Sequence, residues 1–73
     1  MEYMLDPAVI DDARHKGGFT SDDKLAAAID IAGGTIRNLR KGKFSPSLAT
    51  LMKLRDYSGW DLNDMIIEKN TNN

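Results

Sequence analysis

Basic residues cluster in the middle of this chain, between two acidic segments. Residues 31–55 contain no acidic side chain and six basic ones, namely Arg37, Arg40, Lys41, Lys43, Lys53 and Arg55. Residues 1–30 carry a net charge of -4 and residues 56–73 one of -3, so the chain's overall charge of -1 conceals this cluster. Charge of one sign gathered in one place is typical of a surface that approaches phosphate.

The spacing inside the basic segment suits contact with DNA bases. Gly34, Arg37, Asn38 and Lys41 follow one another at helical intervals, so they share one face of a helix. Ile36 and Leu39 fall on the opposite face. Arginine can form two hydrogen bonds with guanine, and asparagine can form two with adenine. The residues that we expect to read bases are Gly34, Thr35, Arg37 and Asn38.

Other polar groups near this face suit the DNA backbone, where contacts position a protein without reading sequence. The residues expected there are Ser21, Lys24, Gly33, Arg40, Lys41 and Lys43. Arg40 lies on the flank of the helix, so its partner is either phosphate or a carboxylate of the same chain. Gly33 and Gly34 either let the backbone approach a base closely, or one of them merely caps the helix. Both alternatives remain open at this stage.

Local signals predict the helices that would position these residues. Asp6 before Pro7 opens a first helix that ends at Gly17 and Gly18. Ser21 caps a second helix over residues 22–29. Asp30, one of the few residue types that tolerate positive φ, makes the turn into a third helix over residues 33–41.

Two further helices complete the prediction. Ser45 before Pro46 opens a fourth helix, which Gly59 ends, and Asp61 caps a short fifth one. No convincing alternation of apolar and polar residues indicates a strand. The expected fold class is therefore all-α, a compact five-helix bundle. Residues 1–69 should form this single domain, and residues 70–73 a frayed polar tail.

The ordered set of these features resembles the XRE family of phage repressors and Cro proteins over residues 21–66. The matching residues are Leu25, Ala26, Ile31, Ile36, Leu39, Gly42, Pro46 and Leu48. The resemblance implies a helix-turn-helix of lambda-repressor type with its core at about 21–42. Three positions depart from the family: Asp22 stands where Gln is frequent, Asp30 where Gly is usual and Arg40 where Glu is frequent.

This resemblance implies a transcriptional regulator of a phage or prophage, acting in the cytoplasm of a bacterial host. It would bind double-stranded operator DNA, with sequence specificity, as a homodimer. The expected dimer interface comprises Trp60, Leu62, Met65 and Ile66, with closure of the core as the alternative. An antitoxin or adaptor that uses the same fold to bind another protein is the second interpretation.

Composition weighs against other classes of protein. The chain has no cysteine and a single histidine, which excludes a disulfide framework and disfavours a metal-ligand cluster. No serine has a base nearby in the sequence, so we expect no enzyme, cofactor or small-molecule ligand. No apolar run is long enough to span a membrane.

Overall fold

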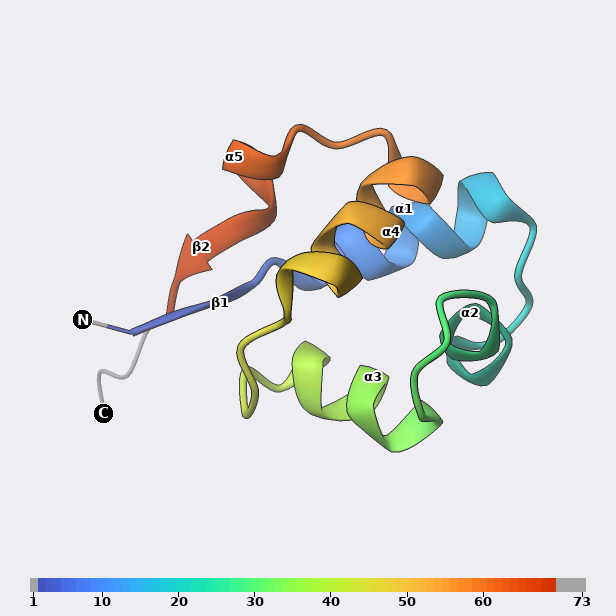
Figure 1. Ribbon diagram of the computed structural model, residues 1–73, viewed down its shortest axis with the longest axis horizontal. Coiled ribbons are helices and arrows are strands. Elements are labelled where there is room, and N and C mark those ends of the chain that lie inside the picture. The colour runs from blue at the N-terminus through green and yellow to red at the C-terminus, as the bar shows by residue number, and fades with distance from the viewer. Residues whose placement is uncertain (1, 70–73) are drawn as a thin grey trace.

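Five helices and one two-stranded sheet make up the computed structural model, which describes residues 2–69 (Figure 1). In chain order the elements are β1 (Tyr3–Leu5), α1 (Pro7–Gly17), α2 (Asp22–Ala28), α3 (Gly33–Arg40), α4 (Leu48–Ser58), α5 (Leu62–Met65) and β2 (Ile66–Glu68). The mostly helical architecture expected from the sequence is confirmed. The polar tail predicted for residues 70–73 lies outside the described residues, as does Met1.

Most helix boundaries follow the capping signals of the sequence. Asp6 accepts a hydrogen bond from the Ala8 amide at 3.0 Å, and Pro7 follows it as the first residue of α1. Ser21 caps α2 by accepting from the Lys24 amide at 3.2 Å. Asp30 has a φ of 63°, as predicted for the turn between α2 and α3. These boundaries were predictable because each cap joins residues close together in the chain.

The predicted start of the fourth helix was wrong by two residues. The cap of α4 is Ser47, whose hydroxyl oxygen accepts from the Thr50 amide at 3.1 Å. Ser45 and Pro46 precede the helix in a connection without regular secondary structure. Both serines are good capping residues, but Ser47 Oγ also donates to Thr50 Oγ1 at 3.0 Å, and that second bond is available only to the later serine.

The strictly all-α expectation was wrong, because a small antiparallel sheet joins the two ends of the described chain. Tyr3 lies opposite Glu68, Met4 opposite Ile67 and Leu5 opposite Ile66. Strands of three residues are too short to show an alternating pattern in the sequence. The sheet also ties its ends to the helices, since the Asp6 amide donates to the Met65 carbonyl at 2.8 Å.

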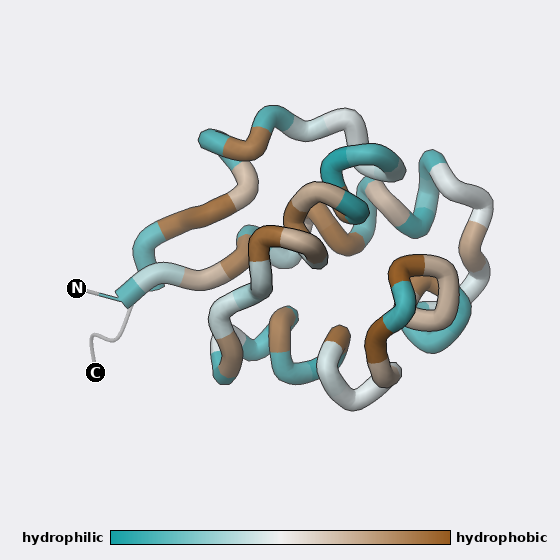
Figure 2. The backbone as a smooth tube through the Cα atoms, in the orientation of Figure 1, coloured by the Kyte–Doolittle hydropathy of each residue, from teal (hydrophilic) through white to brown (hydrophobic). Residues whose placement is uncertain are grey.

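The apolar core lies between the helices and holds one side of α3. Among the described residues the buried apolar side chains are Leu5, Val9, Ile10, Ala13, Leu25, Ala26, Ile29, Ile36, Leu39, Leu54 and Met65. Figure 2 shows the hydrophobic segments of α1 and α4 at the centre of the molecule, while apolar and polar residues alternate along α3. Phe19 and Tyr57 pack against the core, and their rings meet edge to face with centroids 5.2 Å apart.

Gly42 ends the turn after α3 and lies against Met4 of β1. Its φ is 74°, and a Cβ built there would lie 2.9 Å from Met4 Sδ. Its carbonyl accepts from Lys69 Nζ at 2.9 Å. Gly42 therefore needs the conformational freedom of glycine, and a Cβ there would also require the Met4 side chain to shift.

Substituting Gly42 with alanine should destabilise the protein by about 2 kcal/mol, because it adds contact with Met4 to the cost of a positive φ. Gly18→Ala is the matched control: its φ is 73°, but no atom lies within 4 Å of the added Cβ. That variant should lose about 1 kcal/mol. Urea unfolding measures both, and equal losses would contradict the close contact with Met4.

Candidate nucleic-acid interface

Helix α3 is fixed by one apolar face and presents a polar face outward. Ile36 and Leu39 are buried in the core, whereas Arg37 and Lys41 are exposed and Asn38 is half-buried. The four-residue connection at 29–32 brings α3 against α2, and the Ile31 amide donates to the Ala26 carbonyl at 2.9 Å across it. The division of faces predicted from helical spacing is therefore present in the structure.

Gly33 and Gly34 are the first two residues of α3, and neither is its cap. The capping position belongs to Ala32, which has no side-chain acceptor. A Cβ on Gly33 would overlap the carboxylate of Asp23, whereas a Cβ on Gly34 would meet only Arg37 Nη2, at 4.0 Å. Gly33 thus leaves room for the observed position of the Asp23 carboxylate. Gly34 has only the Arg37 guanidinium near it in the described part of the chain.

Arg37 forms an exposed ion pair with Asp23. Its Nη1 atom lies 3.2 Å from Asp23 Oδ1, and the two side chains keep 58% and 71% of their surface exposed. An ion pair this exposed contributes little to stability. The guanidinium therefore stays accessible on the outer face of α3. Asp23 and Arg37 lie fourteen positions apart and in different helices, so spacing along the chain does not predict this pair.

Arg40 is engaged inside the protein, contrary to its predicted role at the DNA backbone. Its Nε donates to Asp22 Oδ2 at 2.7 Å, and its Nη2 donates to Asp22 Oδ1 at 2.9 Å and to Asp11 Oδ1 at 2.8 Å. The side chain is only 25% exposed. Of the two alternatives left open by the sequence, the intramolecular carboxylate is the one observed.

The same cluster includes Arg14, and it keeps Asp22 ionised. Arg14 Nη1 lies 3.2 Å from Asp22 Oδ1, and its Nη2 donates to the Thr20 carbonyl at 2.8 Å. Hydrogen bonding from Arg40 lowers the pKa of Asp22 below its ordinary value, and the charges of Arg40 and Arg14 add to this against the opposing effect of burial. The Asp22 carboxylate in turn raises the pKa of Arg40.

Three lysines remain available around α3. The side chains of Lys24, Lys41 and Lys43 are exposed and form no hydrogen bond or ion pair with any residue in 2–69. Two other cations of the basic segment already have partners within the protein. Lys53 Nζ donates to the Ile29 carbonyl at 3.3 Å, and Arg55 lies 3.6 Å from Asp56. The lysines are therefore the groups best able to meet phosphate without breaking a contact.

The residues predicted for a dimer interface belong largely to the core of one protomer. Met65 is fully buried, so its assignment to an interface was wrong. Trp60 and Leu62 pack against the core, and Trp60 Nε1 donates to Asp12 Oδ2 at 2.7 Å. Ile66 is half-buried in β2. Closure of the core thus accounts for most of this segment.

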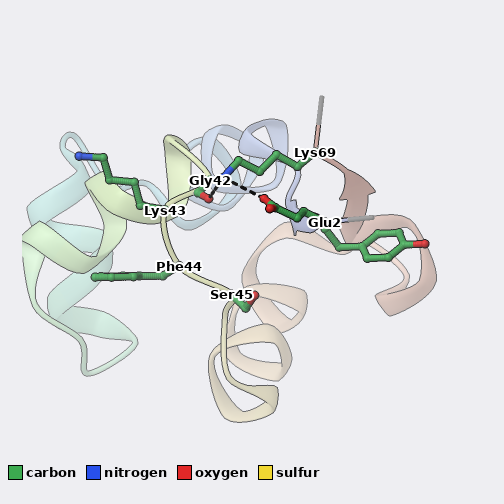
Figure 3. Close-up of a pocket in the computed structure, with 7 residues that line it drawn as sticks. Glu2, Gly42, Lys43, Phe44, Ser45 and Lys69 are labelled. Atoms are coloured by element: carbon green, nitrogen blue, oxygen red, sulfur yellow. Dashed lines mark hydrogen bonds and ion pairs between the residues drawn. The ribbon is translucent and has the colours of Figure 1, made fainter. Parts of the chain in front are cut away.

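An open hollow of about 380 Å³ lies beside the sheet and the loop that follows α3 (Figure 3). Lys69 and Glu2 face each other there at 3.5 Å, and Lys69 also binds the Gly42 carbonyl. Figure 3 shows the Lys43 amine and the Phe44 ring pointing away from this pair. Glu2 and Lys69 therefore tie the two ends of the described chain to the turn after α3.

None of the family models, curated proteins and solved structures compared with this chain matches it. Within residues 2–69 no three His, Cys, Asp or Glu side chains gather as metal ligands would. No helix in that part of the chain is both long and apolar enough to cross a membrane. The geometry of the site is therefore the basis for any statement about its role.

The lowered pKa of Asp22 predicts a specific loss of stability in acid. Stability from this carboxylate is present above its unfolded pKa, near 3.8, and is lost as the pH falls through the lower folded value. At pH 7, Asp22→Asn should cost about 1–2 kcal/mol because charged hydrogen bonds to Arg40 are lost. That difference from the unmodified protein should shrink below pH 4.

Urea unfolding at a series of pH values measures this effect. Asp23→Asn is the matched control, since its exposed pair with Arg37 should change stability by less than about 0.5 kcal/mol at any pH. A constant difference between Asp22→Asn and the unmodified protein from pH 7 to pH 2 would contradict the assignment.

Proposed function

We propose that this protein binds double-stranded DNA in a sequence-specific manner and regulates transcription by occupying an operator. The observation that carries the proposal is α3, whose buried Ile36 and Leu39 fix the helix while Arg37 and Lys41 remain exposed with Asn38 between them. In this proposal α2, the turn at 29–32 and α3 form a helix-turn-helix, with α3 as the recognition helix.

The dimensions and chemistry of α3 support this role. An α-helix with its side chains is about 10–12 Å in diameter, and the major groove of B-DNA is about 12 Å wide, so α3 could enter it. Arg37 and Asn38 offer the side chains best suited to guanine and adenine. Gly34 and Thr35, both half-buried, precede them at the start of the helix. The lack of a side chain at Gly34 would let the backbone approach a base.

The contacts with phosphate would come from the exposed lysines. Lys41 and Lys43 follow the outer face of α3, and Lys24 lies in α2. Ser21 remains a candidate for a phosphate contact: its oxygen already caps α2, but its hydroxyl hydrogen can still donate. A bound regulator would then block access of the polymerase to an overlapping promoter.

Fluorescence anisotropy on labelled DNA from upstream of the protein's own gene, against random DNA at two salt concentrations, tests the proposal. We expect salt-sensitive binding that prefers the upstream DNA. Arg37→Ala/Asn38→Ala should weaken binding to the upstream DNA by about tenfold or more, because each bidentate contact is worth about 1–3 kcal/mol. Binding to random DNA should change far less.

Two control variants separate base reading from charge. Lys41→Ala/Lys43→Ala should weaken binding to both DNAs alike and reduce its salt dependence. Arg55→Ala removes one positive charge in the last turn of α4 and should leave the preference unchanged. Weak binding that is equal for both DNAs and indifferent to the Arg37 and Asn38 changes would contradict DNA recognition.

That result would favour the second candidate function, an antitoxin or adaptor that binds another protein. Its supporting observation is a set of exposed apolar side chains around the start of α4: Phe44 is 49% exposed, Leu48 65% and Met52 42%. Exposed apolar groups of this kind are often found where a partner protein docks. A protein that co-purifies in constant ratio would support this alternative.

We further propose that two protomers bind each operator. One recognition helix reads only a few base pairs, and two half-sites about 34 Å apart would supply the missing specificity. Sedimentation of the protein with upstream DNA should show two protomers per duplex, and a duplex cut to one half-site should bind more weakly. One protomer per full-length site would contradict the dimer.

A further inference from the structure

We propose that Asp23 is a positioning residue for Arg37, which it holds in the orientation that reads guanine. This inference rests on the proposed binding of DNA by α3. It assigns a role in base specificity to an acidic side chain of α2, a residue type that phosphate repels. The argument comes from the arrangement of Asp23, Arg37 and the two glycines that begin α3.

These four residues form one compact group. Asp23 Oδ1 lies 3.2 Å from Arg37 Nη1 and so close to Gly33 that any Cβ there would overlap the carboxylate. Arg37 Nη1 would be 3.6 Å from that Cβ, and Arg37 Nη2 would be 4.0 Å from one on Gly34. The guanidinium therefore folds back over the glycine start of α3, as a helical side chain does when it points toward the N-terminus.

The ion pair with Asp23 leaves Arg37 enough hydrogen-bond donors to bind guanine. Arginine has five N–H donors, and Asp23 uses a donor on Nη1. The donors on Nη2 and Nε remain for the two acceptors of guanine, O6 and N7. Because the planar guanidinium is already held in place, less side-chain freedom is lost when guanine binds.

The carboxylate also acts against the wrong base. Asp23 is a negative charge near the DNA whichever base is present, and only guanine offers Arg37 the two acceptors that offset its repulsion. Specificity of this kind comes from a penalty on the incorrect partner as much as from contacts with the correct one. Removing the charge should therefore raise affinity for random DNA and lower the preference for guanine.

A purely structural role for Asp23 is a poor explanation of this pair. Both side chains are mostly exposed, unlike Asp22 and Arg40, whose side chains are only 20% and 25% exposed. An exposed pair contributes little to stability. A substitution at Asp23 should therefore change base preference while leaving the midpoint of urea unfolding unchanged.

The test compares Asp23→Asn with Asp30→Asn, which removes the same charge from the turn after α2. Asparagine tolerates the positive φ of residue 30, so the control should fold normally. Each protein selects duplexes from a library with a random 20-base-pair centre, and the bound sequences are counted. We expect Asp23→Asn to lose about fivefold or more of its preference for guanine at one position of the site.

Anisotropy on random duplex should show binding by Asp23→Asn strengthened about two- to fivefold at low salt. Asp30→Asn should keep the guanine preference of the unmodified protein. Unchanged preference in Asp23→Asn, or an equal loss in both variants, would overturn the inference while leaving DNA binding in place. Failure of the unmodified protein to select any duplex would overturn the proposed function and this inference with it.

A measurement on the free protein tests the positioning directly. The ¹⁵N heteronuclear NOE of the Arg37 Nε–H group should report an ordered side chain in the unmodified protein and a mobile one in Asp23→Asn. The Arg40 Nε–H group, held by Asp22, should remain ordered in both. An Arg37 side chain that is equally mobile in both proteins would overturn the inference.

Discussion

The orientation of α3 depends on how eight residues are held by two buried side chains and one arginine. Ile36 and Leu39 are buried and pack α3 against the core. Arg40 adds ion pairs to this packing, since its guanidinium reaches Asp22 in α2 and Asp11 in α1. The planar fork of arginine suits this task because it donates in fixed directions.

The same network pairs several acidic residues of the chain with its basic residues. The acidic flanks of the sequence are in part the internal partners of its basic centre, because Asp11 and Asp22 hold Arg40 and Asp23 holds Arg37. The charges that remain unpaired within residues 2–69 include Lys24, Lys41 and Lys43, which lie in or beside α2 and α3. Exposed cations without a partner in residues 2–69 thus occur in and beside α2 and α3, although the chain has a net charge of -1.

The chain ends contribute a second constraint on the region after α3. The sheet of β1 and β2 places Met4 against Gly42, and Lys69 binds the Gly42 carbonyl at 2.9 Å. The turn that ends α3 is therefore held by contacts from both ends of the described chain. Arg37, Lys41 and Lys43 remain exposed beside these contacts.

The sequence by itself determined most helix boundaries of this protein and the two faces of α3. The caps at Asp6 and Ser21, the turn at Asp30 and the two faces of α3 depend on residues within one or two helical turns. The residues that can form the outer face of α3 could therefore be predicted.

Tertiary structure alone decided which of those side chains are available. Arg40 finds its carboxylates 18 and 29 positions earlier, Arg37 finds Asp23 14 positions earlier, and Leu5 pairs with Ile66 across almost the whole chain. Pairings over such separations follow from the packing of helices and not from spacing along the chain. The same packing buried Met65, a residue that the sequence pattern left equally suited to an interface.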